Sequence, residues 1–146
     1  MKIDLEKISE HRCAYTITRN DDTTETIPLD VKTFLLHDVT HFVVEQALNY
    51  EKGFWGMLAA GYPAAALFGR DNPETEELRF IEKIVGPVQS TFAGNIPVSD
   101  FSYYIDYLNF PFPQETLERC LEQIGGIMAD WRLLLPGQAL RLEWRR

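Results

Sequence analysis

Both ends of the chain alternate apolar and polar residues with the two-residue period of a β-strand, and helical sequence lies between them. At the N-terminal end the alternation runs through residues 2–27 and includes a turn signal at 20–22, which predicts a three-stranded meander. At the C-terminal end, Leu140, Leu142 and Trp144 alternate with charged residues. We expect this segment to join the same antiparallel sheet, so that both termini lie in one layer.

Helical patterns fill the region between these strands. Asp30 is a good N-cap, which predicts a helix from Val31 to about Lys52, where Gly53 offers a left-handed stop. The other predicted helices are a short, broken one within 54–68, one capped by Asn72 with Pro73 at its first position, a short one within 97–109, and a regular one at 114–135.

The predicted fold class is therefore α+β. A small antiparallel sheet, made from the N-terminal meander and the C-terminal strand, packs on a bundle of four or five helices. No internal repeat or linker divides the chain, so we expect a single domain over residues 1–146.

The charge balance excludes some classes of partner. The chain has 22 acidic and 14 basic residues and a net charge of −8, which argues against nucleic acid as the main partner. The charge is uneven: residues 131–146 have four arginines and one glutamate, a net +3, whereas residues 1–130 have −11. The basic segment could contact an acidic partner, although four arginines are commonly ordinary surface charge on a last strand.

The sequence also predicts a cellular location. No window is long and apolar enough to span a membrane, and the first residues carry acids where a signal peptide needs an apolar run. Cys13 and Cys120 form no CxxC pair, and we expect two buried structural thiols. These features predict a cytoplasmic protein with reduced cysteines.

One short constellation, His37-Asp38-Val39-Thr40-His41, lies within the first predicted helix. Two histidines four positions apart stand one turn above each other, so their ring nitrogens can converge on one metal ion at the roughly 2.0–2.1 Å that zinc requires. We therefore predict His37 and His41 as metal ligands, with Asp38 or Glu45 assisting. Glu45 is favoured as a group that orients His41. The candidate third ligands are Glu51, His11, Asp100 and Asp106.

The same helix face carries Phe34, Val44 and Leu48, which a fully solvated face would not need. We expect this face to be covered in part by residues 54–68 or by 101–112, leaving a semi-buried polar pocket. The alternative interpretation is structural: the two histidines are partly buried and hydrogen-bond to nearby acids or to the backbone.

The pentad resembles the HExxH helix of zincin metalloproteases with Asp in place of Glu, which implies a general-base role for Asp38. A metzincin-like continuation would place Gly at Val44 and His at Ala47, so a protease is not expected. The pentad is also similar to the HDxxH zinc motif of a ubiquinone-biosynthesis family. His37-Asp38 is similar to the metal doublet of HD-domain phosphohydrolases, which also require an upstream helical histidine.

These observations lead to two functional hypotheses. The first is a small cytoplasmic protein that binds a divalent metal, with zinc as the first candidate, through His37 and His41. It would catalyse metal-assisted hydrolysis of a small molecule, with Asp38 or Glu45 accepting the proton. Nucleotide and α/β-hydrolase motifs are absent from the sequence.

The second hypothesis is a non-catalytic interaction module, monomeric or homodimeric, in which the histidines are structural. Its contact surface would be an aromatic segment around two prolines, made of Phe101, Tyr103, Tyr104, Tyr107, Phe110 and Phe112.

Overall fold

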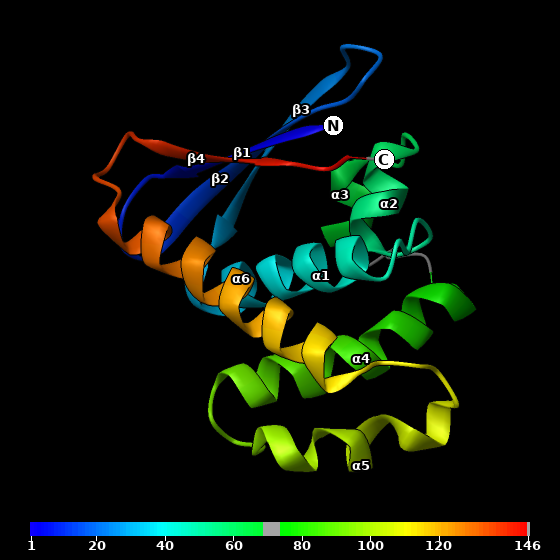
Figure 1. The fold of residues 1–146 in the computed structure, drawn as a ribbon. Helices are drawn as coiled ribbons and strands as arrows, with labels where there is room; N and C mark the ends of the chain where they lie inside the picture. The colour runs from blue at the N-terminus through cyan, green and yellow to red at the C-terminus, as the bar shows by residue number, and fades with distance from the viewer. Residues whose placement is uncertain (69–73, 146) are drawn as a thin grey trace.

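The computed structural model describes residues 1–68 and 74–145. Its four strands are β1 (Lys2–Lys7), β2 (Arg12–Thr18), β3 (Thr24–Asp30) and β4 (Ala139–Glu143). They form one antiparallel sheet in the order β3-β2-β1-β4, with β1 pairing both with the next strand of the meander and with the C-terminal strand (Figure 1). The predicted α+β class and the shared layer of both termini are confirmed.

The described residues form six α-helices, two of them only five residues long. They are α1 (Leu36–Ala47), α2 (Phe54–Ala59), α3 (Ala64–Phe68), α4 (Glu76–Phe92), α5 (Phe101–Ile105) and α6 (Gln114–Leu133). Short 3₁₀ turns, η2 (Val98–Asp100) and η3 (Asp106–Leu108), flank α5. In this part of the chain, no helix is both long enough and apolar enough to cross a membrane.

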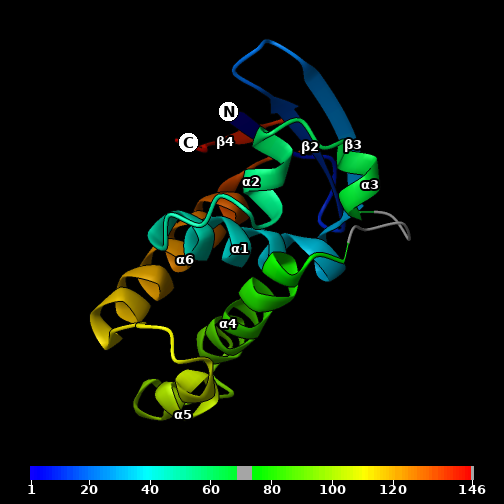
Figure 2. The ribbon, with the colours of Figure 1, turned by 90° about the vertical axis from the view of Figure 1, so that its right-hand side faces the viewer.

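Helix α1 is the centre of the packing. It lies between the sheet and α4, and α6 runs beside it (Figures 1 and 2). The core-facing side chains of the sheet, such as Ile3 and Ile17, are fully buried and belong to one cluster with Val39 and Val43 of α1. The opposite side of α1 faces α4, and this arrangement positions the candidate site.

The helix predicted from Val31 to about Lys52 is shorter in the structure. The helical turns do begin at Val31, as a single π-helical turn, η1 (Val31–Leu35), whose N-cap Asp30 accepts the Thr33 backbone N–H. However, α1 ends at Ala47, because Asn49 adopts a left-handed conformation with φ of 54° and closes a Schellman-type C-cap. Asparagine therefore stops this helix four residues before the predicted glycine.

The remaining helix predictions differ mainly at their ends. The predicted cap Asn72 and Pro73 lie outside the described residues, and α4 is capped by Thr75, whose side chain accepts the Leu78 N–H. Helix α6 ends at Leu133, two residues before the predicted boundary. The thiols of Cys13 and Cys120 are buried and free, as predicted, and burial raises the pKa of each to about 11.

Candidate metal site

Two facing helices bring the candidate site together. His37 and His41 project from α1, and Glu82 projects from the neighbouring α4. One ligand atom from each of these three side chains lies within 4.8 Å of the other two, so the cluster could hold a metal ion. The exposed fraction rises from 3% for His41 through 36% for His37 to 50% for Glu82, so the cluster extends from the interior to the surface.

The orientation of His41 is fixed by Glu45, one turn further along α1. His41 Nδ1 lies 2.9 Å from a Glu45 carboxylate oxygen. The same carboxylate, fully buried, also accepts the backbone N–H groups of Phe54 at 2.7 Å and Trp55 at 2.9 Å at the start of α2. A carboxylate with these donors is an acceptor, so His41 Nδ1 must carry a proton. The Nε2 atom of His41 is therefore the nitrogen that faces Glu82, at 2.8 Å from its Oε1.

His37 is oriented in the same manner by α4. Its Nδ1 lies 2.9 Å from the amide oxygen Oε1 of Gln89, which can only accept, and its Nε2 lies 3.4 Å from Glu82 Oε1. The two imidazole rings are nearly perpendicular, with centroids 4.7 Å apart. In both histidines, Nδ1 is thus hydrogen-bonded to an acceptor of the protein and Nε2 points toward the same carboxylate. Metal-ligating histidines commonly show this arrangement.

The spacing of these atoms fits a small divalent ion. Ligand atoms about 2.05 Å from a tetrahedral zinc ion are roughly 3.3 Å from one another. The 3.4 Å between His37 Nε2 and Glu82 Oε1 already matches this value. The 2.8 Å between His41 Nε2 and the same oxygen would have to open by roughly 0.5 Å. Glu82 is half exposed, so a small rotation of its side chain can supply that change.

In the ion-free protein a proton occupies the position between His41 and Glu82. Burial alone would lower the pKa of His41, but the hydrogen bonds to Glu45 and Glu82 outweigh it and raise the pKa to about 9. Burial would raise the pKa of Glu82, yet the hydrogen bonds with His37 and His41 hold it well below its usual range. The hydrogen bond with Glu82 raises the pKa of His37, against the opposing effect of burial. A metal ion would therefore replace a proton on His41.

Asp38 lies beside the cluster but is not part of it. Its side chain accepts the Tyr15 phenol O–H at 2.9 Å, and its backbone carbonyl accepts the Trp55 indole N–H. Burial raises the pKa of Asp38 to about 7, although the Tyr15 hydrogen bond acts in the opposite direction. Burial between α1 and β2 thus brings the pKa of this acid toward neutrality.

A cavity of about 220 Å³ opens next to these groups. It is lined by four polar side chains, His37, Asp38, His41 and Glu82, and by four apolar ones, Phe34, Phe54, Leu67 and Phe68. The four apolar side chains come from η1, α2 and α3. A small substrate in this cavity would meet the cluster on one side and an apolar wall on the other.

The sequence predictions and the structure agree on some residues and differ on others. The histidine face is covered in part by residues 54–68 and by α4, while residues 101–112 do not line the cavity. The third member of the cluster is Glu82, not Glu51, His11, Asp100 or Asp106. Glu45 contacts His41 and the start of α2 and does not line the cavity.

The sequence contains only a weak indication that Glu82 faces a neighbouring helix. Glu82 and Gln89 are seven residues apart, so they stand two turns apart on one stripe of α4. This stripe borders the buried positions Ile81, Val85 and Val88. Polar residues that flank an apolar face at this spacing can face a neighbouring helix, but nothing in the sequence pairs them with the histidines.

Comparison with known proteins adds no relative. No family model, curated protein or solved structure matches the chain. The class that the structure defines is an α+β protein with a cluster of two histidines and one carboxylate.

Proposed function

We propose that the protein binds one divalent metal ion through His37, His41 and Glu82 and uses it to hydrolyse a small substrate. The observation that carries this proposal is the orientation of the two imidazoles. Each has its Nδ1 bound to a protein acceptor and its Nε2 directed at the same Glu82 carboxylate. A structural role requires only that each histidine has hydrogen-bond partners, whereas the convergence of both Nε2 atoms and a carboxylate on one point suits an ion.

Zinc is the first candidate because it takes imidazole and carboxylate ligands at the spacing found here. Three protein ligands leave one tetrahedral position open, which is typical of catalytic zinc sites. The same donor set with more open positions also suits iron(II), so the metal present in purified protein decides between them.

The protein's own residues can supply the remaining chemistry. A bound divalent ion acts as a Lewis acid and lowers the pKa of a coordinated water. Asp38 lines the same cavity, and its pKa of about 7 is suited to accepting and returning a proton at neutral pH. Tyr15 holds the Asp38 carboxyl in place, and the wall formed by Phe34 and Phe54 favours a substrate with a small apolar group.

Metal binding is tested first and without reference to activity. Protein purified without an affinity tag is analysed for zinc, iron and manganese, then stripped and titrated with zinc against a chromophoric chelator. We expect one ion per chain, and binding at least tenfold weaker in Glu82→Gln than in the matched surface control Glu122→Gln. Binding that is substoichiometric, or equal in the two variants, would contradict the site.

Hydrolysis is tested on the zinc-loaded protein with a panel of p-nitrophenyl esters of short acyl chains. We expect zinc-dependent turnover that falls by about 10²-fold or more in Asp38→Asn, while zinc affinity in the chelator assay stays within a factor of a few. No zinc-dependent turnover in the wild type would reject ester hydrolysis, and full activity in Asp38→Asn would reject the role of Asp38.

A contact function for the aromatic segment is the second candidate. Tyr103, Tyr104 and Tyr107 are exposed on and just after α5, whereas Phe101 is buried in the core. Exposed tyrosines supply large contact area with a polar edge, which suits a protein interface. Sedimentation of the wild type and of the double variant Tyr104→Ala plus Tyr107→Ala tests homodimer formation. We expect self-association that the variant loses, and a monomeric wild type at all concentrations would count against it.

A further inference from the structure

Strand β4 is an open edge of the sheet. At one end of its pairing with β1, Met1 and Trp144 exchange two backbone hydrogen bonds, and at the other end the Lys7 N–H donates to the Gln138 carbonyl. Hydrogen-bonded and non-hydrogen-bonded pairs alternate in an antiparallel ladder. Even-numbered residues of β4 therefore bond to β1, and Ala139, Arg141 and Glu143 direct their backbone N–H and C=O groups away from the sheet.

The two edges of the sheet are protected differently. On the other edge strand, β3, the bond from Val31 N–H to the His11 carbonyl places Pro28 among the outward-facing residues. Proline has no N–H to offer, and it commonly blocks edge strands from pairing with another chain. Strand β4 contains no proline.

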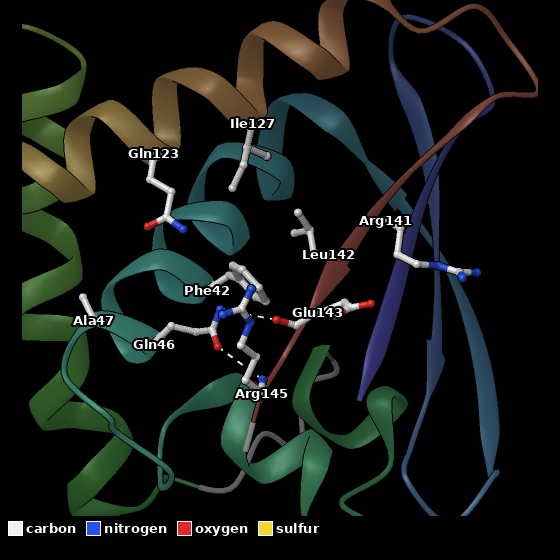
Figure 3. A pocket seen from close by; sticks show the side chains of 9 residues that line it. All are labelled: Phe42, Gln46, Ala47, Gln123, Ile127, Arg141, Leu142, Glu143 and Arg145. Carbon is white, nitrogen blue, oxygen red and sulfur yellow. Dashed lines mark hydrogen bonds between the residues drawn. The ribbon is translucent and has the colours of Figure 1, made fainter.

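At one end of the β4 edge, the Gln46 side chain makes backbone hydrogen bonds of the kind that a neighbouring strand would make. The Gln46 amide donates from Nε2 to the Glu143 carbonyl at 3.4 Å and accepts the Arg145 N–H at Oε1 at 3.3 Å (Figure 3). A residue of an adjacent strand would make the same two bonds. Within the described residues, no second strand pairs with this edge. The Arg141 N–H and C=O and the Glu143 N–H therefore face outward beyond the Gln46 bridge.

A groove of about 620 Å³ runs along this edge, between β4, α1 and α6. Its lining is mixed: Phe42, Ile127 and Leu142 contribute apolar atoms, and Gln46 and Gln123 contribute polar ones (Figure 3). The side chain of Arg141 points to the opposite side of β4 and binds Asp4 at 2.7 and 2.9 Å. An added strand would place alternate side chains over this groove.

Arg145 provides the charge in this groove. Its side chain folds back over the α1 end of the groove in Figure 3, and no described carboxylate lies within 4.0 Å of its guanidinium nitrogens. The segment 131–146 has a net charge of +3 against −11 for the rest of the chain. Because Asp4 already pairs with Arg141, the charge left at this edge for a partner is that of Arg145, and an acidic side chain of an added strand would complement it.

We propose that the open edge of β4 binds a short extended segment of a partner protein by strand addition. The segment alternates apolar and polar residues and has an acidic side chain at the end that meets Arg145. Backbone hydrogen bonds to Arg141 and Glu143 hold the strand, and its inward-facing side chains enter the groove of mixed polar and apolar lining. Gln46 limits the paired length to about three to five residues, because it occupies the next bonding position.

The test uses synthetic peptides and backbone amide chemical shifts. The probe is an acetylated, amidated pentapeptide that alternates threonine and valine and ends in glutamate. Two control peptides carry N-methyl groups on the residues meant to bond β4, or lysine in place of glutamate. We expect the probe to shift the amide signals of Arg141 and Glu143, and each control to bind about five- to tenfold more weakly.

Matched variants of the protein separate the two contributions. Glu143→Pro removes the outward N–H and leaves every hydrogen bond to β1 in place. The variant should therefore bind the probe peptide about tenfold more weakly than Glu143→Ala does. Arg145→Gln should lower affinity for the glutamate peptide only, by about fivefold. Zinc binding and melting temperature should stay unchanged in all three variants, which separates this site from the metal site.

Other outcomes would overturn the proposal. If the N-methylated peptide binds as well as the probe, or Glu143→Pro binds it as well as Glu143→Ala, the groove holds a carboxylate and not a strand. If no peptide shifts the β4 amides at about 2 mM, or if these amides shift with protein concentration alone, strand addition by an acidic partner is wrong.

Discussion

Replacing Glu45 with Gln should destabilise the fold out of proportion to the small chemical change. The Glu45 carboxylate is fully buried and accepts three backbone N–H groups, from Phe54 at 2.7 Å, Trp55 at 2.9 Å and Gly56 at 3.4 Å, besides His41 Nδ1 at 2.9 Å. A glutamine has the same shape, but one of its two terminal atoms is an NH₂ group that only donates. In any orientation that NH₂ meets another donor.

The expected loss follows from these contacts. The better orientation keeps the oxygen toward His41 and Phe54, and leaves the N–H groups of Trp55 and Gly56 facing the new NH₂. A buried N–H without an acceptor costs about 1–3 kcal/mol, and removing one charge of a buried ion pair costs about 3–5 kcal/mol. We therefore expect Glu45→Gln to lower the free energy of unfolding by about 3–5 kcal/mol, a large part of the 5–15 kcal/mol typical of a domain.

The assay is urea unfolding of metal-free protein, followed by circular dichroism and tryptophan fluorescence in the presence of a chelator. Glu122→Gln, on the exposed face of α6, is the matched control and should stay within about 0.5 kcal/mol of the wild type. A loss of less than about 1 kcal/mol in the free energy of unfolding of Glu45→Gln would show that the Glu45 carboxylate does not stabilise the start of α2 as a charged acceptor. The assignment of a proton to His41 Nδ1 would then lose its support.

Two further predictions concern the packing around this anchor and the buried thiols. A Cβ at Gly53 would lie 2.4 Å from the Glu45 Cδ, so Gly53→Ala should displace the carboxylate and lower stability by about 1–3 kcal/mol. Gly126→Ala, in open space on α6, should instead be neutral or stabilising by up to about 1 kcal/mol in the same urea assay, and equal effects would contradict the close approach. The pKa of about 11 and the burial of Cys13 and Cys120 predict that both stay protonated and unreactive toward a thiol reagent at pH 8. In native protein, labelling at the rate seen in urea would show that prediction to be wrong.

The sheet and the long helices were predictable because their patterns are local. Alternation in residues 2–27 and 140–144 determines the strands, and the apolar spacing in 114–135 determines α6. The end of α1 was predicted wrongly because two residues can stop a helix in that segment. Asn49 takes the left-handed conformation, while Gly53 is needed for a different reason, the close approach of the Glu45 carboxylate.

The candidate site was only half predictable. His37 and His41 belong to one helix, so their mutual position follows from helical geometry alone. Glu82 is 41 residues further along the chain than His41, and its place beside the histidines depends on how α4 packs on α1. No periodic pattern encodes that contact. The role of Glu45 as the acceptor for the start of α2 likewise depends on the turn at 48–53, which the predicted long helix had excluded.

The most direct test of the metal site is diffraction from crystals grown with one equivalent of zinc, with data collected on both sides of the zinc absorption edge. We predict one anomalous peak between α1 and α4, about 2.0–2.2 Å from His37 Nε2, His41 Nε2 and a Glu82 oxygen. The Nδ1 atoms should remain bound to Gln89 and Glu45. A map without a peak at this position, with His41 still hydrogen-bonded to Glu82, would contradict the account.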